Sequence, residues 1–187
     1  MSPIRPLQYI ALIGAYERDN FGDILFLKVY QKLLEPWPIV ALSLASRDME
    51  REGAGAVIGV PAWFTACGRE FLPHAVIVAG GEVFTSGVVD AYSCLIDPQQ
   101  SRSLYRAKPE FRHSLAALIT GNSGDLAYVP QRSFMPEVHL AMNSVGGSDF
   151  GGKPVERAAA TLALSRSAYT SVRDARTQAN LSEGAVT

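Results

Sequence analysis

The chain has 187 residues, of which 48% are hydrophobic and 19% are charged, and its formal net charge is −1. This length and composition predict a folded α/β protein rather than a disordered chain, and the near-zero charge gives no basic face for nucleic acid. No segment of the sequence is long enough to span a membrane. The two cysteines, Cys67 and Cys94, are too few for a disulfide scaffold and lack the spacing of metal ligands, so we expect a cytoplasmic protein.

The N-terminal part of the chain predicts a strand followed by a helix. Residues 8–14 form an apolar run that ends at Gly14, as expected for a strand buried on both faces. A signal peptide is the alternative, but Pro6 lies at the start of the run and charged residues follow where a cleavage site needs small ones. From Phe21 apolar residues recur at helical spacing until Pro36, which predicts a helix between these two residues.

The rest of the chain alternates between predicted strands and helices. We expect strands at residues 38–44, 56–60, 75–80, 126–129, 138–147 and 169–172, and helices at 88–96, 110–119, 152–167 and 174–184. The stretch 98–109 is predicted to be an exposed loop. Such alternation predicts an α/β, Rossmann-like fold, with a mostly parallel sheet and helices on both faces. After Gly184 the letters "AVT" resemble the opening of a further strand, so we expect the natural chain to continue.

Four predicted strand ends carry glycines or polar side chains, at residues 15–23, 80–86, 143–148 and 173–174. Ligands of open parallel sheets bind beyond the carboxyl ends of the strands. Glycines at these ends let backbone N–H groups approach a ligand closely. We therefore expect the four segments to form one functional rim.

Each of these features also has a purely structural explanation. A glycine pair after a strand is often only a tight turn, and Asp23 could cap the helix that begins near Phe21. Arg173 could form an internal ion pair with Asp174, which would itself cap the last helix. The chain matches no nucleotide-binding fingerprint and no nucleophile elbow, and its three histidines lack metal-type spacing, so we expect no metal site.

The first of these segments resembles a motif of the polysaccharide pyruvyl transferase family. Members of this family open with a strand and a G-N-x-G-D turn into a helix. Asn20, Gly22 and Asp23 match this turn, whereas Asp19 stands where glycine is usual.

Three further segments carry the same resemblance along the chain. "VIVAGGEVF" matches the family's glycine-ended strand, and "MNSVGG" loosely matches its third strand end. The most specific match is "SVRD", followed by a threonine, a leucine and a glycine in the order of the family, at Ser171, Val172, Arg173, Asp174, Thr177, Leu181 and Gly184. The matches span nearly all of the chain and correspond to the N-terminal half of the family's members.

The resemblance implies that residues 1–187 form a single Rossmann-like domain, the N-terminal half of a two-domain enzyme similar to GT-B glycosyltransferases. Such an enzyme transfers the enolpyruvyl group of phosphoenolpyruvate onto two hydroxyls of a sugar, here in a cell-surface or exopolysaccharide precursor, and uses no other cofactor. With the second half missing, we expect the isolated chain to be inactive.

The chemistry of ketal formation assigns the expected roles. Proton removal from a sugar hydroxyl needs a base, so Asp23 is the expected catalytic residue. The donor's phosphate and carboxylate need cationic and N–H groups, which Arg173 and the glycines could supply. The expected substrate-binding residues are Asn20, Gly22, Gly80, Gly81, Glu82, Asn143 and Arg173.

Two alternatives remain open at the level of sequence. One is a GT-B-like glycosyltransferase that uses a nucleotide sugar, because fold does not fix function. The other is a non-enzymatic Rossmann-like domain that binds a sugar or a partner protein. A homo-oligomer is compatible with each of these.

Overall fold

The computed structural model describes residues 8–18, 20–67, 72–130, 137–147, 149–150 and 153–183. Seven strands within these residues form one sheet in the order β3-β4-β2-β1-β5-β6-β7. Their bounds are β1 Ile10–Ile13, β2 Ile39–Ser43, β3 Arg47–Met49, β4 Gly55–Gly59, β5 Ala75–Ala79, β6 His139–Val145 and β7 Tyr169–Val172. Neighbouring strands are parallel except for β3, which pairs with β4 in the antiparallel direction. The predicted α/β fold with a mostly parallel sheet is thus confirmed.

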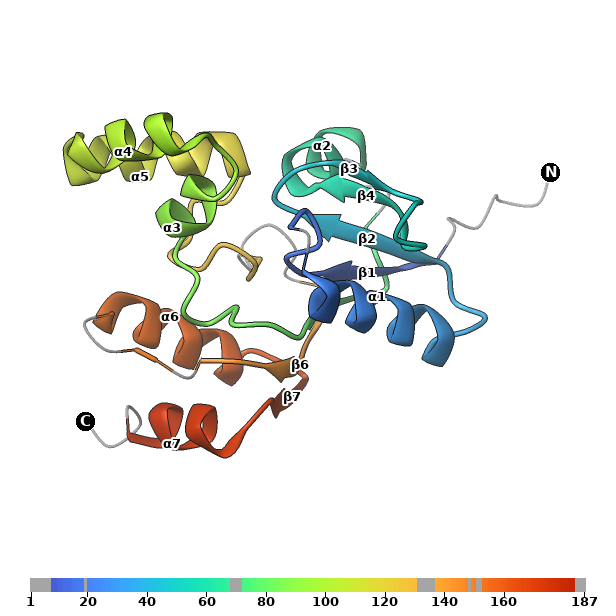
Figure 1. Ribbon diagram of the computed structural model, residues 1–187. Coiled ribbons are helices and arrows are strands. Elements are labelled where there is room, and N and C mark those ends of the chain that lie inside the picture. The colour runs from blue at the N-terminus through green and yellow to red at the C-terminus, as the bar shows by residue number, and fades with distance from the viewer. Residues whose placement is uncertain are drawn as a thin grey trace.

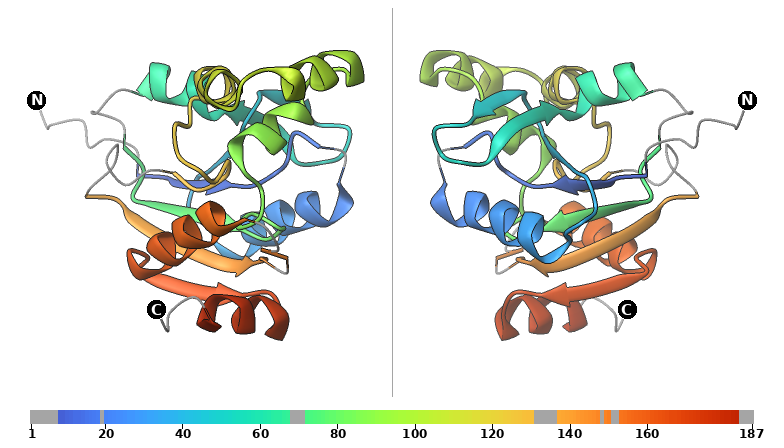
Figure 2. Two further views of the ribbon diagram at one scale, coloured as in Figure 1. Left: turned by 90° about the vertical axis from the view of Figure 1, so that its left-hand side faces the viewer. Right: turned by 90° about the vertical axis from the view of Figure 1, so that its right-hand side faces the viewer.

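The parallel strands have the order of a doubly wound Rossmann-like sheet. Strand β1 lies in the centre and pairs with β2 on one side and with β5 on the other. The chain therefore builds outward from β1 to β2 and β4, and then returns to build β5, β6 and β7 on the opposite side. In the side views of Figure 2 this second half runs from β1 in blue through green β5 and orange β6 to red β7. The reversal between β1 and β5 is the topological switch point, where such sheets bind ligands.

Two hydrophobic cores lie on the two faces of the sheet. Helix α1 (Phe21–Leu33) contributes Ile24, Leu27 and Tyr30 to one core, which also receives Leu12 from β1. The other core receives Ala11 and Ile13 from β1, together with residues of helices α2 (Val60–Cys67) and α6 (Pro154–Ser165). Because alternate residues of a strand point to opposite faces, β1 is buried on both, as its unbroken apolar sequence predicts.

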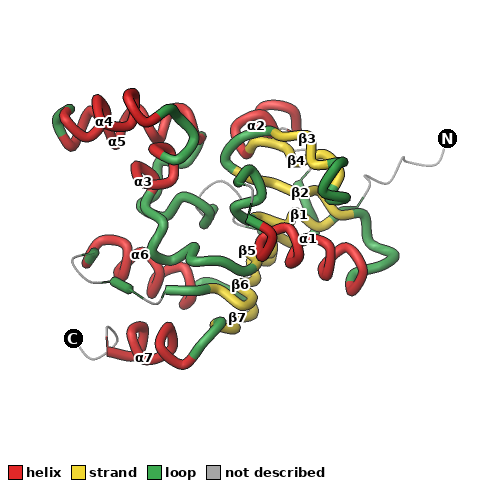
Figure 3. The backbone as a smooth tube through the Cα atoms, in the orientation of Figure 1, coloured by secondary structure: helices red, strands yellow, loops and turns green. Residues whose placement is uncertain are grey.

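The remaining helices are α3 (Val88–Ser93), α4 (Pro98–Arg106), α5 (Pro109–Thr120) and α7 (Ala175–Glu183). Helices α3, α4 and α5 pack against one another, whereas α7 lies against α6 and β7. In Figure 1 the arrowheads of β1 and β2 point toward the side on which α3, α4 and α5 lie. Figure 3 shows in green the loops that lie between the sheet and helices α3 and α6. None of the helices within the described ranges is long and apolar enough to cross a membrane.

Two local predictions differ from the structure, two elements were not expected, and one expectation falls outside the described residues. The stretch 98–109, expected to be a loop, contains helix α4. Asp97 caps the N-terminus of this helix, because its side chain accepts hydrogen bonds from the backbone N–H groups of Gln99 and Gln100. The expected strand at 126–129 is reduced to one bridge between Leu126 and Gly87. Strand β3 and helix α2 were not expected. Gly184 and the expected strand after it lie outside the described residues.

Removing the central side chain of β1 tests this architecture. Leu12 is completely buried, so Leu12→Ala should lower the free energy of unfolding by about 2–5 kcal/mol through lost apolar contacts and a residual cavity. Urea denaturation measures this change. The control is Leu118→Ala on α5, where the side chain is 79% exposed and the expected change is within about 0.5 kcal/mol. Equal effects of the two substitutions would contradict the central position of β1.

Candidate functional site

The structure brings the four predicted segments together at the carboxyl edge of the sheet. Backbone hydrogen bonds join three of them directly: Gly80 N donates to Asn143 O at 3.0 Å, Gly146 N to Gly81 O at 2.7 Å, and Arg173 N to Val145 O at 3.0 Å. These bonds fix the loops that follow β5, β6 and β7 side by side. Residue 148, at the end of the third segment, lies outside the described residues.

Two glycines let these loops approach so closely. Gly81 has a φ of +69°, a left-handed conformation that side chains other than glycine rarely adopt. A Cβ atom at Gly81 would lie 3.1 Å from Asp23 Oδ1, so the loop after β5 also touches the first turn of α1. A Cβ atom at Gly146 would lie 2.8 Å from Gly81 O and 3.2 Å from Arg173 Cζ. The glycine pattern in the sequence therefore reflects the packing of all four segments against one another.

Asn20 and Asp23 act together at the start of α1. Asn20 is the N-cap, because its Oδ1 accepts a hydrogen bond from Gly22 N at 3.0 Å, and its Nδ2 donates to Asp23 Oδ2 at 2.8 Å. The structural explanation that Asp23 caps this helix is therefore wrong, since a cap must precede the first helical residue. Asp23 is 7% exposed, and burial raises the pKa of its carboxyl, although the bond from Asn20 and the charges of Arg18 and Arg173 partly oppose this. Residue 19 lies outside the described residues.

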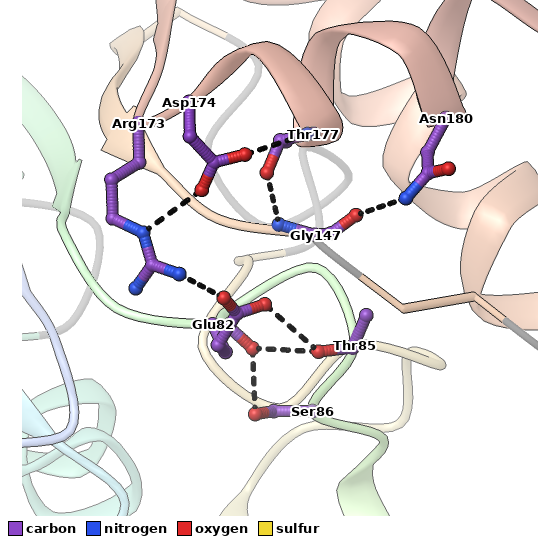
Figure 4. A network of polar contacts seen from close by, with 8 residues as sticks. All are labelled: Glu82, Thr85, Ser86, Gly147, Arg173, Asp174, Thr177 and Asn180. Carbon is purple, nitrogen blue, oxygen red and sulfur yellow. Dashed lines mark hydrogen bonds and ion pairs between the residues drawn. The ribbon is translucent and has the colours of Figure 1, made fainter.

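Arg173 lies between two carboxylates at the end of β7 (Figure 4). Its Nη2 donates to Glu82 Oε1, and its Nε lies 3.3 Å from Asp174 Oδ2. The predicted ion pair between Arg173 and Asp174 is therefore present. Glu82 belongs to the loop after β5, so the guanidinium connects strands that are separated in the sheet by β6. Both partners and Arg173 remain more than a third exposed, which leaves the cation accessible to a ligand.

Asp174 also holds the N-terminus of α7 in place. Its Oδ1 accepts a hydrogen bond from Thr177 N at 2.7 Å, which confirms the predicted cap. The bonds from Thr177 lower the pKa of this carboxyl, and Arg173 adds to the effect. Thr177 Oγ1 in turn accepts from Gly147 N at 3.0 Å, and Asn180 Nδ2 donates to Gly147 O at 3.1 Å, so α7 is tied to the loop after β6 (Figure 4).

Asn143, predicted to bind substrate, uses both ends of its side chain within the protein. Its Nδ2 donates to the hydroxyl of Tyr30 on α1, and its Oδ1 accepts from Ser171 Oγ on β7. Ser171 Oγ also accepts from Ser144 N, at 2.9 Å, where the pairing of β6 with β7 changes register. The structure thus gives Asn143 the role of linking β6 to α1 and to β7.

A buried acid that sequence reasoning did not select lies beside the predicted rim. Glu17 is 8% exposed, and its carboxylate accepts hydrogen bonds from Ser43 Oγ and, at 2.6 Å, from the hydroxyl of Tyr128. Arg18 Nε lies 3.6 Å from Glu17 Oε1, and Arg47 Nη1 donates to Glu17 O at 2.8 Å. Burial raises the pKa of Glu17, although the bond from Tyr128 and the charge of Arg18 oppose the shift. The one signal in the sequence was a charged residue three positions after the end of the predicted buried strand at residues 8–14.

Tyr16, the neighbour of Glu17, carries a second unusual polar group. Its side chain is completely buried, and within the described part of the chain its hydroxyl has no hydrogen-bond partner. Burial raises the pKa of this phenol, and the charge of Asp23 raises it further. The loop after β1 therefore delivers a buried acid, a buried phenol and a cation to the switch point.

The carboxyl edge of the sheet combines acidic, amide and cationic groups. The carboxyl groups of Asp23 and Glu17 can each donate or accept a proton. The amide of Asn20 can donate or accept hydrogen bonds, and the guanidinium of Arg173 can bind an anion. Among the described residues, no group of three or more histidine, cysteine, aspartate or glutamate side chains is placed to hold a metal ion. Comparison of the chain with models of known protein families, with curated proteins and with solved structures finds no match.

The buried carboxyl of Glu17 predicts a specific dependence of stability on pH. Because burial raises its pKa, the folded protein holds this proton more tightly than the unfolded chain, so stability falls as pH rises from about 4 through the folded-state pKa. Glu17→Gln removes the titration and should abolish this part of the fall. Its unfolding free energy, measured with urea between about pH 4 and pH 8, should therefore increase relative to the wild type as pH rises.

The control for this experiment is Glu50→Gln, which removes a carboxylate from an exposed turn. The unfolding free energy of Glu50→Gln should differ from that of wild type by a nearly constant amount across the same pH range. Asp23 titrates in all three proteins, and because its charge also raises the pKa of Glu17, the difference between Glu17→Gln and wild type includes this coupling. A difference between Glu17→Gln and wild type that does not change with pH would show that Glu17 is not the buried group that titrates.

Proposed function

We propose that this chain functions as part of a polysaccharide pyruvyl transferase, which moves pyruvate from phosphoenolpyruvate onto a sugar of a cell-surface or exopolysaccharide precursor. The observation that carries the proposal is that Asp23 and Arg173, 150 positions apart in the sequence, lie at one edge of the sheet, where the charge of Arg173 partly opposes the rise in the pKa of Asp23. This edge is the switch point, where a ligand of a doubly wound sheet binds. The motifs "DNFGD", "AGGEVF" and "SVRD" that resemble the family supply these residues.

The reaction balances without a further reactant. The oxygen of one sugar hydroxyl bonds to C2 of phosphoenolpyruvate, and C3 gains a proton in place of the one that the hydroxyl loses. A second hydroxyl then displaces the phosphate, which leaves with the second proton, and a pyruvate ketal remains. The protein must therefore accept a proton from a hydroxyl and hold an anionic donor.

Arg173 is suited to hold the donor. A guanidinium binds phosphate or carboxylate through two parallel hydrogen bonds, and Asp174 engages only its Nε atom. The carboxylate of Glu82 occupies Nη2, which is where a donor anion would bind. Glu82 therefore competes with the donor, in contrast to the substrate-binding role that the sequence suggested for it.

Asp23 is suited to accept the proton of the acceptor hydroxyl. A carboxyl whose pKa is raised by burial is a stronger base than an ordinary aspartate, and Asn20 Nδ2 fixes the orientation of its Oδ2. Asp23 Oδ1 faces the backbone of Gly81, on the same edge as Arg173. Under the proposal, Arg173 serves the donor and Asp23 the acceptor at this edge.

Binding experiments separate the proposed activity from its alternatives. Isothermal titration calorimetry of the protein with phosphoenolpyruvate should show binding, whereas a nucleotide sugar should give no heat of binding. Binding of the nucleotide sugar alone would indicate a GT-B-like glycosyltransferase. Binding of a free sugar without either donor would indicate a non-enzymatic sugar-binding domain.

Opposite effects of two substitutions test the donor site. In the complete enzyme, Arg173→Lys keeps the charge but loses the two-pronged geometry, so phosphoenolpyruvate binding should weaken by about 1–3 kcal/mol. Glu82→Gln removes the competing carboxylate and should strengthen the same binding. Both affinities are measured by calorimetry. If Glu82→Gln weakened binding, Glu82 would be a contact of the donor rather than its competitor.

A substitution of Asp23 tests the acceptor side. In the complete enzyme, Asp23→Asn fills the same space but cannot take a proton, so turnover should fall about 10²–10⁴-fold while affinity for phosphoenolpyruvate stays nearly unchanged. Pyruvate incorporation into the glycan and calorimetry give the two values. Asp48→Asn, in the edge strand β3, is the control and should change neither value. Full turnover in Asp23→Asn would reduce Asp23 to a structural residue.

A further inference from the structure

Helix α1 is apolar on two opposite faces. Its inner face contributes Ile24, Leu27 and Tyr30 to the core. Its outer face carries a second set of large apolar side chains at four-residue spacing, which we call the outer row. The exposed fractions of its members are 77% for Phe21, 47% for Leu25, 43% for Val29 and 72% for Leu33. A helix that is apolar all round is normally buried all round, so the outer row is the part of α1 that the described residues leave open to solvent.

The outer row forms one continuous ridge along the helix. Residues four apart in an α-helix differ by about 40° in rotation, so they lie nearly above one another and their side chains are neighbours. The row extends over residues 21–33, which is the whole length of α1. Single exposed apolar side chains are normal on a protein surface, whereas a contiguous patch of them marks an interaction site.

The charged residues of the outer surface of α1 lie beside the row and not in it. Lys28 and Lys32 are both exposed, and Lys32 Nζ lies 3.1 Å from Glu35 Oε2, just beyond the end of the helix. The surface therefore has an uncharged apolar centre and charged side chains at its border. This is the composition of protein–protein interfaces, in which the rim stays in contact with water.

We propose that the outer row of α1 packs against the outer row of a second copy of this chain, so that the protein forms a homodimer. Ridges of residues four apart fit into the grooves between the same ridges of another helix at a crossing angle of about −50°, the commonest class of helix packing. A second copy is a partner that necessarily carries this ridge over the same length. The inference does not depend on the proposed transferase activity.

The size of the outer row agrees with a dimer. The exposed fractions of its four members correspond to about 450 Å² of mostly apolar surface, as large as the biggest patch on a typical monomer, about 300–600 Å². Two copies bury about twice this area from the rows alone, and the flanking residues, Lys28 and Lys32 among them, add the rim. The total then exceeds the roughly 1,000 Å² that a biological interface needs.

The dimer places each candidate site at the border of the interface without covering it. Phe21, the first member of the outer row, directly follows Asn20, which caps α1 and donates a hydrogen bond to Asp23. Asp23 itself is buried and faces Gly81 on the inner side of the helix. Pairing of the outer rows therefore holds α1 on both faces and leaves the side of Asp23 that faces the sheet unchanged.

Sedimentation equilibrium of the wild type and two variants tests the dimer. At micromolar concentrations the wild type should have twice the 20.2 kDa mass of one chain. Leu25→Glu buries a charge in the interface, so the dissociation constant should rise about tenfold or more. The matched control is Leu162→Glu on α6, where the leucine is 49% exposed, and it should dimerise as the wild type does. A monomeric wild type, or a dimer that Leu25→Glu does not weaken, would overturn the proposal.

Hydrogen exchange locates the interface without any substitution, and so holds even if Leu25→Glu fails to fold. The backbone amides of residues 21–33 in the wild type should exchange more slowly as the protein concentration rises through the range in which the mass doubles, because the dimer suppresses local opening of α1. The amides of α5 should show no such dependence. Exchange of residues 21–33 that stays constant while the mass doubles would place the interface elsewhere and overturn the proposal.

Discussion

The position of β1 is the constraint on which the rest of the structure depends. Its four residues are apolar, are buried on both faces and pair with β2 and β5 on its two sides, so the strand cannot lie at an edge or face water. A central first strand means that the chain leaves it in one direction and must later return to its other side. The crevice at this reversal receives the loops after β1 and β5, and the polar residues of both loops are consequently forced together at one place.

Close approach at this crevice depends on glycine. The left-handed conformation at Gly81 and the short distances at Gly146 let three loops pack backbone to backbone. A side chain at either position would separate the loop after β5 from Asp23 or from Arg173. The same backbone contacts hold Glu82 where it can pair with Arg173, so the electrostatics of the edge follow from its packing.

The sequence predicted those parts of the fold whose signal is local. β1 and β5 are unbroken apolar runs and α1 has helical periodicity, and all three lie where expected. Helix α4 is amphipathic but mostly polar, with Leu104 its one buried residue, so its low apolar content favoured a loop, although the cap at Asp97 followed by Pro98 was a signal of a helix start. Strand β3 has three residues, two of them charged, and forms by pairing with β4 at the edge of the sheet.

The candidate site shows the same division between local and long-range information. The convergence of residues near Asp23, Gly81 and Arg173 follows from one rule, that parallel strands end at the same edge. Glu17 could not be selected in this way, because its partners Ser43 and Tyr128 lie 26 and 111 positions away and only the folded chain brings them together. The partners of Asn143 are equally remote, on α1 and β7, and they turn an expected ligand contact into a link between elements.

The two carboxylates that contact Arg173 differ in what holds them. This difference decides which of the two an incoming anion would displace from the guanidinium. Asp174 is fixed by the cap that it forms on α7, so it orients the guanidinium whether or not a ligand is present. Glu82 is contacted by Thr85 Oγ1, 3.5 Å from its Oε2, and its pair with Arg173 is partly exposed, a kind of ion pair that contributes only about 0–1 kcal/mol. The loss of that pair alone would therefore cost little if an anion with two well-placed oxygens took its place. Asp174 thus orients the arginine and Glu82 forms its exchangeable pair, which is the property that the proposed anion site relies on.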